Sequence, residues 1–193
     1  GIMAEDFTLP AVRRAVTGIA RYVSSRKPKG AAIVVGRDPR FLGETLVPLA
    51  ADILTAHGIT ALVIPDPAPT PAISYEIVRR HADGGINFTA SHNPPEYNGL
   101  KFSTSDGAPA LPETTKQIEA EINALDEAAG ARPPAGAKAR SEIIEARSAY
   151  LKRLEEIVDL KAIRKSGLHI AFDPLWGSAR GYPDSLLREH GIE

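Results

Sequence analysis

The chain has 193 residues, with 23 Lys or Arg, 24 Asp or Glu and no Cys. This length suits one large domain, or one domain with part of another, and can bury a core without disulfide or metal staples. The formal net charge of −1 excludes the overall basic field typical of nucleic-acid binding, and the lack of Cys excludes thiol catalysis and Cys-based zinc sites. No apolar run reaches the roughly 18–20 residues that span a membrane. The acidic start GIMAEDFT lacks the basic region of a signal peptide, so we expect a cytoplasmic location.

Two short apolar runs stand out in the first part of the chain. Ala31–Val35 and Ala61–Ile64 are closed by a glycine and a proline, a pattern that predicts strands buried on both faces of a parallel sheet. Upstream, Thr8 is placed as the cap of a helix whose apolar residues recur at helical spacing as far as Val23.

The segment between those runs predicts a second helix. Its apolar residues keep helical spacing up to Gly58, which suits the position just after a helix end. Pro48 is tolerated only in a first turn, so we expect this helix to begin close to Thr45.

Prolines then punctuate the chain at positions 65, 67, 69 and 71, which predicts an extended loop. Thr70 or Pro71 opens a helix that runs to about His81. Gly85–Thr89 and Leu100–Ser103 have the composition of strands. Another helix is marked by apolar residues at Ile118, Ile122 and Leu125. Alternating helices and strands predict an α/β fold.

The composition changes at residue 126. Residues 126–140 are rich in Ala, Gly and Pro, which is typical of a linker. About 50 residues follow, too few for a comfortable independent core. We therefore divide the chain into a first domain, residues 1–140, and an incomplete start of a second, residues 141–193. The elements expected there are a helix capped by Ser148, a strand at Leu168–Phe172 and a helix at Pro183–His190.

The stretch TASHNPPEYNGLK, residues 89–101, directly follows a predicted strand, where ligands usually bind in α/β proteins. It contains the hydroxyl of Ser91, the imidazole of His92 and the ammonium of Lys101. Asn98-Gly99 permits a tight turn that brings Lys101 back towards Ser91. Such a set suits covalent or phosphoryl-transfer chemistry, although the side chains of adjacent Ser91 and His92 are expected to point apart. By composition alone, a surface turn is the simpler interpretation.

Longer motifs favour the chemical interpretation. TASHNP followed by YNGLK resembles the phosphoserine loop of the α-D-phosphohexomutase superfamily, which includes phosphoglucomutase and phosphomannomutase. Three further segments resemble that family in the same order along the chain: GRDPRFLGE (36–44), PAPTPAI (67–73) and DPLWGSARG (173–181). The resemblance implies a three-layer α/β/α domain with a mixed, largely parallel sheet, followed by a partial second α/β unit.

The resemblance also implies an activity. The serine that matches Ser91 carries a phosphoryl group, donates it to a hexose phosphate to give a bisphosphorylated sugar, and takes the other phosphate back. The net reaction interconverts hexose 1-phosphate and hexose 6-phosphate, and a sugar bisphosphate acts as primer. The family holds Mg²⁺ between the Ser91 phosphate and three aspartates of a second-domain loop, which by this resemblance falls after residue 193.

Individual roles follow from the same resemblance. Lys101 matches a general acid/base or phosphate clamp, and His92 matches a histidine that orients substrate or moves a proton. Arg40 and Asn93 are placed as substrate-phosphate ligands. Arg40 and Asp38 are also expected to form an ion pair that structures the floor of the site, for which a plain surface salt bridge is an equally good interpretation. For Asn93 a simple turn residue is the alternative.

The family's sugar-selecting and C-terminal phosphate-binding loops also fall beyond residue 193 by this resemblance. We therefore expect the 193-residue chain to carry the nucleophile without turning over. Two alternatives stay open. A serine hydrolase or phosphatase lacks support because Ser91 has no Gly-x-Ser-x-Gly elbow. A non-catalytic module that binds a sugar phosphate or a partner protein would use Ser91 as a regulatory phosphosite.

Overall fold

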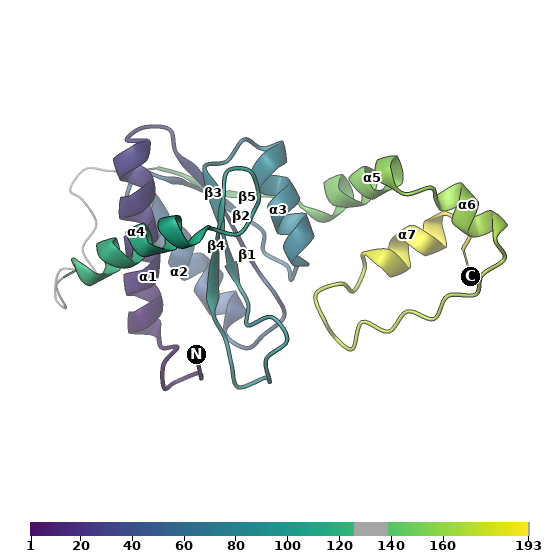
Figure 1. The fold of residues 1–193 in the computed structure, drawn as a ribbon, viewed down its shortest axis with the longest axis horizontal. Coiled ribbons are helices and arrows are strands. Elements are labelled where there is room, and N and C mark those ends of the chain that lie inside the picture. The colour runs from purple at the N-terminus through teal and green to yellow at the C-terminus, as the bar shows by residue number, and fades with distance from the viewer. Residues whose placement is uncertain (126–138, 193) are drawn as a thin grey trace.

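The computed structural model describes residues 1–125 and 139–192. A five-stranded sheet lies between helices on both faces, so the predicted α/β/α class is confirmed (Figure 1). The strands are β1 (Ala32–Arg37), β2 (Thr60–Val63), β3 (Gly84–Phe88), β4 (Leu100–Thr104) and β5 (Ser141–Ile143). The helices are α1 (Leu9–Arg26), α2 (Gly43–Ala56), α3 (Thr70–Arg79), α4 (Pro112–Asn123), α5 (Arg147–Ile157), α6 (Leu160–Lys165) and α7 (Pro183–Glu189).

The sheet is mixed and largely parallel, with the strand order β4-β3-β1-β2-β5. β1 pairs in parallel with β2 and β3, and β2 pairs in parallel with β5, whereas β4 runs antiparallel to β3. The four predicted strands of the first part correspond to β1 to β4. β5 was not predicted, because three residues carry no periodic pattern and their pairing partner at Ala61 lies far away in the sequence.

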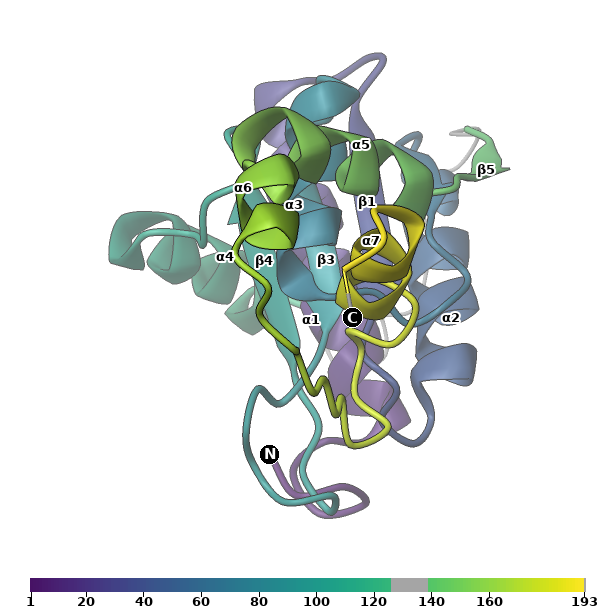
Figure 2. The ribbon, with the colours of Figure 1, turned by 90° about the vertical axis from the view of Figure 1, so that its right-hand side faces the viewer.

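Each face of the sheet has its own apolar core. Ile33 and Val35 of β1 face α1, α2 and α4, while Val34 between them faces α3 and α5. This follows from the alternation of side chains along a strand. α5, α6 and α7 lie together beyond α3, as the side view shows (Figure 2). No helix in residues 1–125 and 139–192 is long and apolar enough to cross a membrane.

The helix ends show where local signals are reliable. Thr8 caps α1 as predicted, and its Oγ1 accepts a hydrogen bond from the N–H of Ala11 at 3.3 Å. The predicted start of α2 near Thr45 is wrong, because the helix begins at Gly43 and Pro48 lies in its second turn. Pro48 deprives the carbonyl of Glu44 of its helical donor. Glu44 is exposed, so water can take that place.

The expected strand at Leu168–Phe172 is wrong. These residues have no regular secondary structure and pair with no strand among the described residues. Their apolar side chains are exposed, with Leu168 at 61% and Ile170 at 39%. A strand forms only where a neighbouring strand satisfies its backbone N–H and C=O groups. The alternation of apolar residues in the sequence does not report whether such a neighbour exists.

The expected cap at Ser148 is also wrong. Ser148 lies inside α5, and the carboxylate of Glu145 accepts hydrogen bonds from the N–H groups of Arg147 and Ser148 at 2.8 and 3.1 Å. A carboxylate is favoured there by the partial positive charge of a helix N-terminus. The helix predicted from Pro183 is confirmed as α7. α6 was not predicted, although Asp159 caps it through the N–H of Ala162 at 2.9 Å.

Most of the linker predicted at residues 126–140 falls outside the described residues. The division of the chain at about residue 140 stays a prediction. The structure adds that β5, immediately after that point, is the edge strand of the main sheet next to β2.

Candidate active site

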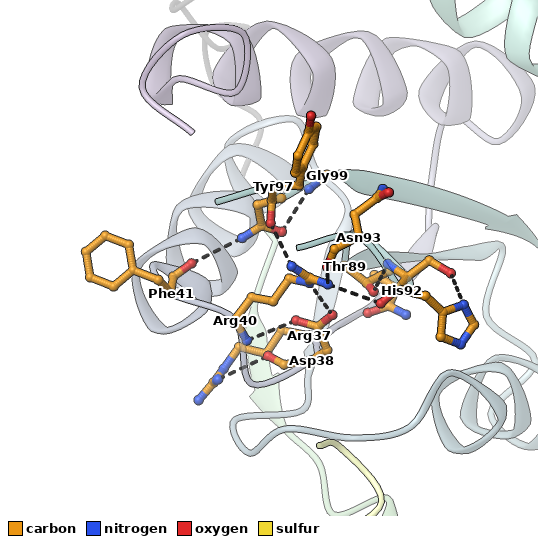
Figure 3. Close-up of polar contacts among 12 residues, drawn as sticks. Arg37, Asp38, Arg40, Phe41, Thr89, His92, Asn93, Tyr97 and Gly99 are labelled. Carbon is orange, nitrogen blue, oxygen red and sulfur yellow. Dashed lines mark hydrogen bonds and ion pairs between the residues drawn. The ribbon is translucent and has the colours of Figure 1, made fainter. Parts of the chain in front are cut away.

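The loop of residues 89–99 connects β3 to β4 at the edge where the parallel strands β1 and β3 end. Arg37 is paired with Phe88, and Phe88 with Leu100, so the loop begins and closes at this edge. The segment between β1 and α2 lies beside it and supplies Asp38 and Arg40 (Figure 3). This is the edge at which open α/β sheets usually bind ligands.

Ser91 is exposed and has a left-handed backbone conformation, with a φ of 56°. A left-handed residue other than glycine is strained by contact of its Cβ with the backbone. The buried Thr89 supports this conformation, since its Oγ1 accepts a hydrogen bond from the N–H of Ser91 at 3.0 Å. The loop thus holds the serine hydroxyl in a fixed, accessible position.

His92 lies close to that hydroxyl. Its Nδ1 is 3.3 Å from Ser91 Oγ, and the ring tautomer decides which of the two donates (Figure 3). The expectation that these side chains point apart is therefore wrong. Successive side chains alternate in extended backbone, whereas Ser91 has a left-handed backbone conformation.

Arg40 lies beneath the loop and is mostly buried, with 15% of its side chain exposed. The expected ion pair is confirmed: Nε is 3.3 Å from Asp38 Oδ2. The remaining guanidinium nitrogens donate to backbone carbonyls. The acceptors are Pro94 (2.8 Å) and Tyr97 (3.0 Å) for Nη1, and Ser91 (3.2 Å) and Asn93 (2.6 Å) for Nη2.

Lys101 lies on β4, directly opposite Asn87 of β3. Paired residues of an antiparallel ladder share a face, and Asn87 donates to Thr70 Oγ1 at the start of α3 at 3.1 Å. Lys101 is thus placed on the α3 side of the sheet. Its side chain is exposed and forms no hydrogen bond or ion pair with the described residues.

Asn93 is exposed, and its backbone N–H donates to the carbonyl of Ala90 at 3.1 Å, as in a turn. The phosphate-binding roles of Arg40 and Asn93 stay predictions, as do the catalytic roles of Ser91, His92 and Lys101.

Two residues that position the loop, Thr89 and Asn98, carry no signal in the sequence beyond that of a turn. Thr89 supports Ser91 as described. Asn98 is fully buried at the base of the loop, where its Nδ2 donates to the carbonyl of Phe41 at 3.1 Å and its Oδ1 accepts from the N–H of Gly99 at 2.8 Å. A buried Asn with both ends bonded fixes a turn far more tightly than an exposed one. The N-terminal segment lies beside this base, and the N–H of Met3 donates to the carbonyl of Glu96 at 2.9 Å (Figures 1 and 2).

The described residues do not by themselves form a magnesium site. Within residues 1–125 and 139–192 no three His, Asp or Glu side chains lie close enough together to hold a metal ion. Mg²⁺ requires about six oxygen ligands in near-octahedral geometry. Phosphorylated Ser91 would supply one of them, and the described residues do not supply the rest.

An accessible serine on a hydrogen-bonded loop at the carboxyl ends of parallel strands places this chain among α/β proteins with a candidate nucleophile at the usual ligand-binding end of the sheet. Residues 1–129 match the family model described as phosphoglucomutase/phosphomannomutase, alpha/beta/alpha domain I. The chain therefore belongs to the phosphoglucomutase/phosphomannomutase family.

Relatives support the same placement. The chain is 32% identical over all its 193 residues to the phosphoglucosamine mutase of Alkaliphilus metalliredigens, of which it covers 42%. It is 34% identical over 115 residues to the phosphoglucomutase of Staphylococcus saprophyticus, a match of 60% of this chain and 21% of that protein. The crystal structure of a Thermus thermophilus protein assigned as a phosphomannomutase superimposes with a TM-score of 0.87 at 32% identity, covering 100% of this chain and 42% of that one. The chain spans less than half the length of these relatives.

Proposed function

We propose that Ser91 carries a phosphoryl group in a reaction that interconverts hexose 1-phosphate and hexose 6-phosphate. The proposal rests mainly on the exposed hydroxyl of Ser91. The left-handed backbone of this residue is supported by a hydrogen bond to Thr89, and an imidazole nitrogen of His92 lies 3.3 Å from the hydroxyl. Membership of the family supports the same activity. Because the chain spans less than half of its relatives, the proposal concerns the complete natural polypeptide that contains these residues.

In the proposed reaction, the Oγ–P bond of phosphorylated Ser91 breaks while a P–O bond forms to the 6-hydroxyl of hexose 1-phosphate. The electron pair of the broken bond stays on Oγ, and the sugar hydroxyl passes its proton to a base, which yields hexose 1,6-bisphosphate. The bisphosphate then turns round and returns its other phosphoryl group to Ser91. Hexose 6-phosphate leaves, and a hexose bisphosphate serves as primer for unphosphorylated serine.

His92 and Lys101 have separate proposed roles. His92 orients Oγ and exchanges a proton with it, because its Nδ1 already lies within reach. Lys101 offers an ammonium without an acidic partner among the described residues, which suits contact with a phosphate. Mg²⁺, when bound, would offset the charge of about −1.5 to −2 that a phosphoserine brings. A cytoplasmic setting is part of the proposal.

The hexose is proposed as a class. The relatives described above are named for glucosamine, glucose and mannose phosphates. These sugars differ at a single carbon, and none of the residues placed in the site distinguishes them.

The test is steady-state kinetics of the complete natural polypeptide with Mg²⁺, a hexose 1,6-bisphosphate and each hexose 1-phosphate. Ser91→Ala is expected to abolish interconversion. Ser105→Ala, which removes an exposed hydroxyl beyond the other end of β4, is the matched control and should leave the rate unchanged. Undiminished interconversion by Ser91→Ala would exclude the proposed nucleophile.

The same measurement on the purified 193-residue chain tests the expectation that this length alone does not turn over. Exchange of phosphate between Ser91 of the complete natural polypeptide and a labelled hexose phosphate separates the alternative of a binding module. A regulatory phosphosite on Ser91 would be filled by a kinase and would not exchange with any hexose phosphate.

A further inference from the structure

The loop that holds Ser91 has its backbone carbonyls gathered on one side chain. The guanidinium of Arg40 donates hydrogen bonds to four of these carbonyls, at distances of 2.6 to 3.2 Å. They belong to Ser91, Asn93, Pro94 and Tyr97. Those four acceptors span most of the loop, from the serine itself to the residue before Asn98. The loop is therefore wrapped around a single planar cation.

Both terminal nitrogens of the Arg40 guanidinium donate two hydrogen bonds each. A guanidinium has five N–H groups in a fixed plane. Four face the loop carbonyls, and the fifth, on Nε, faces Asp38 Oδ2 at 3.3 Å. Asp38 is itself only 16% exposed and also accepts a hydrogen bond from the N–H of Arg40 at 3.0 Å. Its charge compensates the buried cation and fixes the plane of the guanidinium.

The other hydrogen bonds at the tip of the loop join neutral groups, among them the bonds from the N–H of Ser91 to Thr89 Oγ1 and from the N–H of Met3 to the carbonyl of Glu96 described above. Within the loop, the N–H of Asn93 donates to Ala90 and that of Tyr97 to Pro94, both at 3.1 Å. All residues from Ser91 to Glu96 are exposed, so apolar packing contributes little. The contacts to Arg40 are charge-assisted, which makes each of them stronger than the neutral hydrogen bonds of the loop.

We infer that Arg40 is a positioning residue, which sets the geometry of the Ser91 loop through its carbonyls and does not itself bind the substrate phosphate. This inference rests on the proposed function only where it concerns catalysis. A phosphate could engage Arg40 only by displacing the loop carbonyls that Arg40 already binds. Lysine cannot replace it, because a single ammonium has three N–H groups on one atom and cannot reach four carbonyls and a carboxylate.

The structural part is tested by amide hydrogen exchange of the 193-residue chain and its Arg40→Lys variant, followed on peptides that cover residues 89–99. Arg40→Lys keeps the charge and is expected to accelerate exchange in this loop by about tenfold or more, with the strands β1 and β3 unchanged. Arg14→Lys is the matched control. Arg14 donates to the carbonyls of Ile122 and Leu125 at the end of α4, so its loss should leave the Ser91 loop unaffected.

Loop exchange within about twofold of the unmodified chain, or equal acceleration throughout the sheet, would overturn the inference. Should Arg40→Lys fail to fold, Asp38→Asn provides the same test. It keeps the guanidinium and removes only its charge partner, so a smaller acceleration confined to the loop is expected.

The catalytic part is tested in the complete natural polypeptide. A positioning role predicts that Arg40→Lys lowers kcat about tenfold or more while KM for the hexose 1-phosphate changes by less than about threefold. A raised KM at unchanged kcat would instead identify Arg40 as a phosphate ligand. If the unmodified protein interconverts no hexose phosphate, the proposed function fails, and the exchange experiment still decides the role of Arg40.

Discussion

The Nδ1 of His92 lies 3.3 Å from Oγ of Ser91, although the two residues are neighbours in the sequence. This contact depends on the left-handed φ of Ser91. The same backbone turn therefore exposes the hydroxyl and supplies it with a group that can orient it and move its proton.

Loss of this imidazole should slow phosphoryl transfer. His92→Asn in the complete natural polypeptide is expected to lower kcat for hexose phosphate interconversion about a hundredfold, the usual contribution of a positioned acid/base group. The control is His81→Asn, at an exposed left-handed residue that precedes β3 at the opposite edge of the sheet. Equal rates for the two variants would show that His92 has no part in the transfer.

The strain at Ser91 predicts a stability difference between two variants that both lack the hydroxyl. Ser91→Gly should be more stable than Ser91→Ala by about 0.5–1 kcal/mol, because glycine adopts a left-handed φ without a Cβ contact. Urea unfolding of the 193-residue chain measures the difference. If Ser91→Ala is equally stable or more so, the loop does not hold residue 91 in this conformation.

Much of the fold, but not its edges, follows from the sequence. Thr8 and the apolar runs that form β1 and β2 are local signals, and the structure confirms them. Leu168–Phe172 has an equally good strand pattern but no neighbouring strand among the described residues. β5, by contrast, has almost no pattern and is formed by pairing with β2. Strand formation at an edge depends on a partner that is distant in the sequence, and no local pattern reports it.

In the candidate site, too, local features could be predicted from the sequence and features that depend on the backbone could not. The residue types of the loop were recognised from the motif, and the ion pair of Arg40 with Asp38 was among the expectations. The four carbonyls around Arg40 could not be foreseen, because backbone acceptors carry no residue identity. The contact between His92 and Ser91 was not predicted, because no residue type in the loop signals the positive φ of Ser91.

A buried ion-pair cluster on α3 should be the most sensitive polar element for stability. Glu76 is fully buried, and its carboxylate accepts two hydrogen bonds from Arg79 at 2.8 Å and one from Arg80 Nε at 2.6 Å. The carboxylate raises the pKa of the Arg79 guanidinium. Glu76→Gln removes the charge partner of two arginines and is expected to lower the free energy of unfolding by about 3 kcal/mol.

Urea unfolding again provides the measurement, with Glu156→Gln as its control. Glu156 forms an exposed pair with Arg153 at 2.8 Å, where 46% of the Arg153 side chain and 53% of the Glu156 side chain are accessible. Loss of such a surface pair should change the stability by less than about 1 kcal/mol. If both variants lose a similar amount of unfolding free energy, the buried Glu76 cluster contributes no more to stability than an exposed ion pair does.

The buried Tyr182 predicts that the stability of the folded chain decreases at alkaline pH. Burial raises the pKa of Tyr182 to about 12, with a further contribution from the nearby carboxylate of Glu145. The pKa of a tyrosine in the unfolded chain is about 10, so the folded state binds the phenol proton more tightly than the unfolded state does between the two pKa values. Stability contributed by the neutral phenol is thus fully present below about pH 10 and is lost as the pH rises towards 12.

Urea midpoints between pH 8 and pH 12, measured for the chain and for Tyr182→Phe, test this prediction. The chain should lose stability more steeply than the variant above about pH 10. Parallel curves would show that Tyr182 ionises as it does in water.

In the proposed reaction Ser91 carries a phosphoryl group that it exchanges with hexose phosphates. The most direct measurement is peptide mapping of the complete natural polypeptide after incubation with a hexose 1,6-bisphosphate labelled in its phosphates. We predict label on the peptide that contains Ser91, and its loss to the sugar when unlabelled hexose 1-phosphate is added. Label that is absent from Ser91, or that stays on Ser91 when hexose 1-phosphate is supplied, would contradict this role of Ser91.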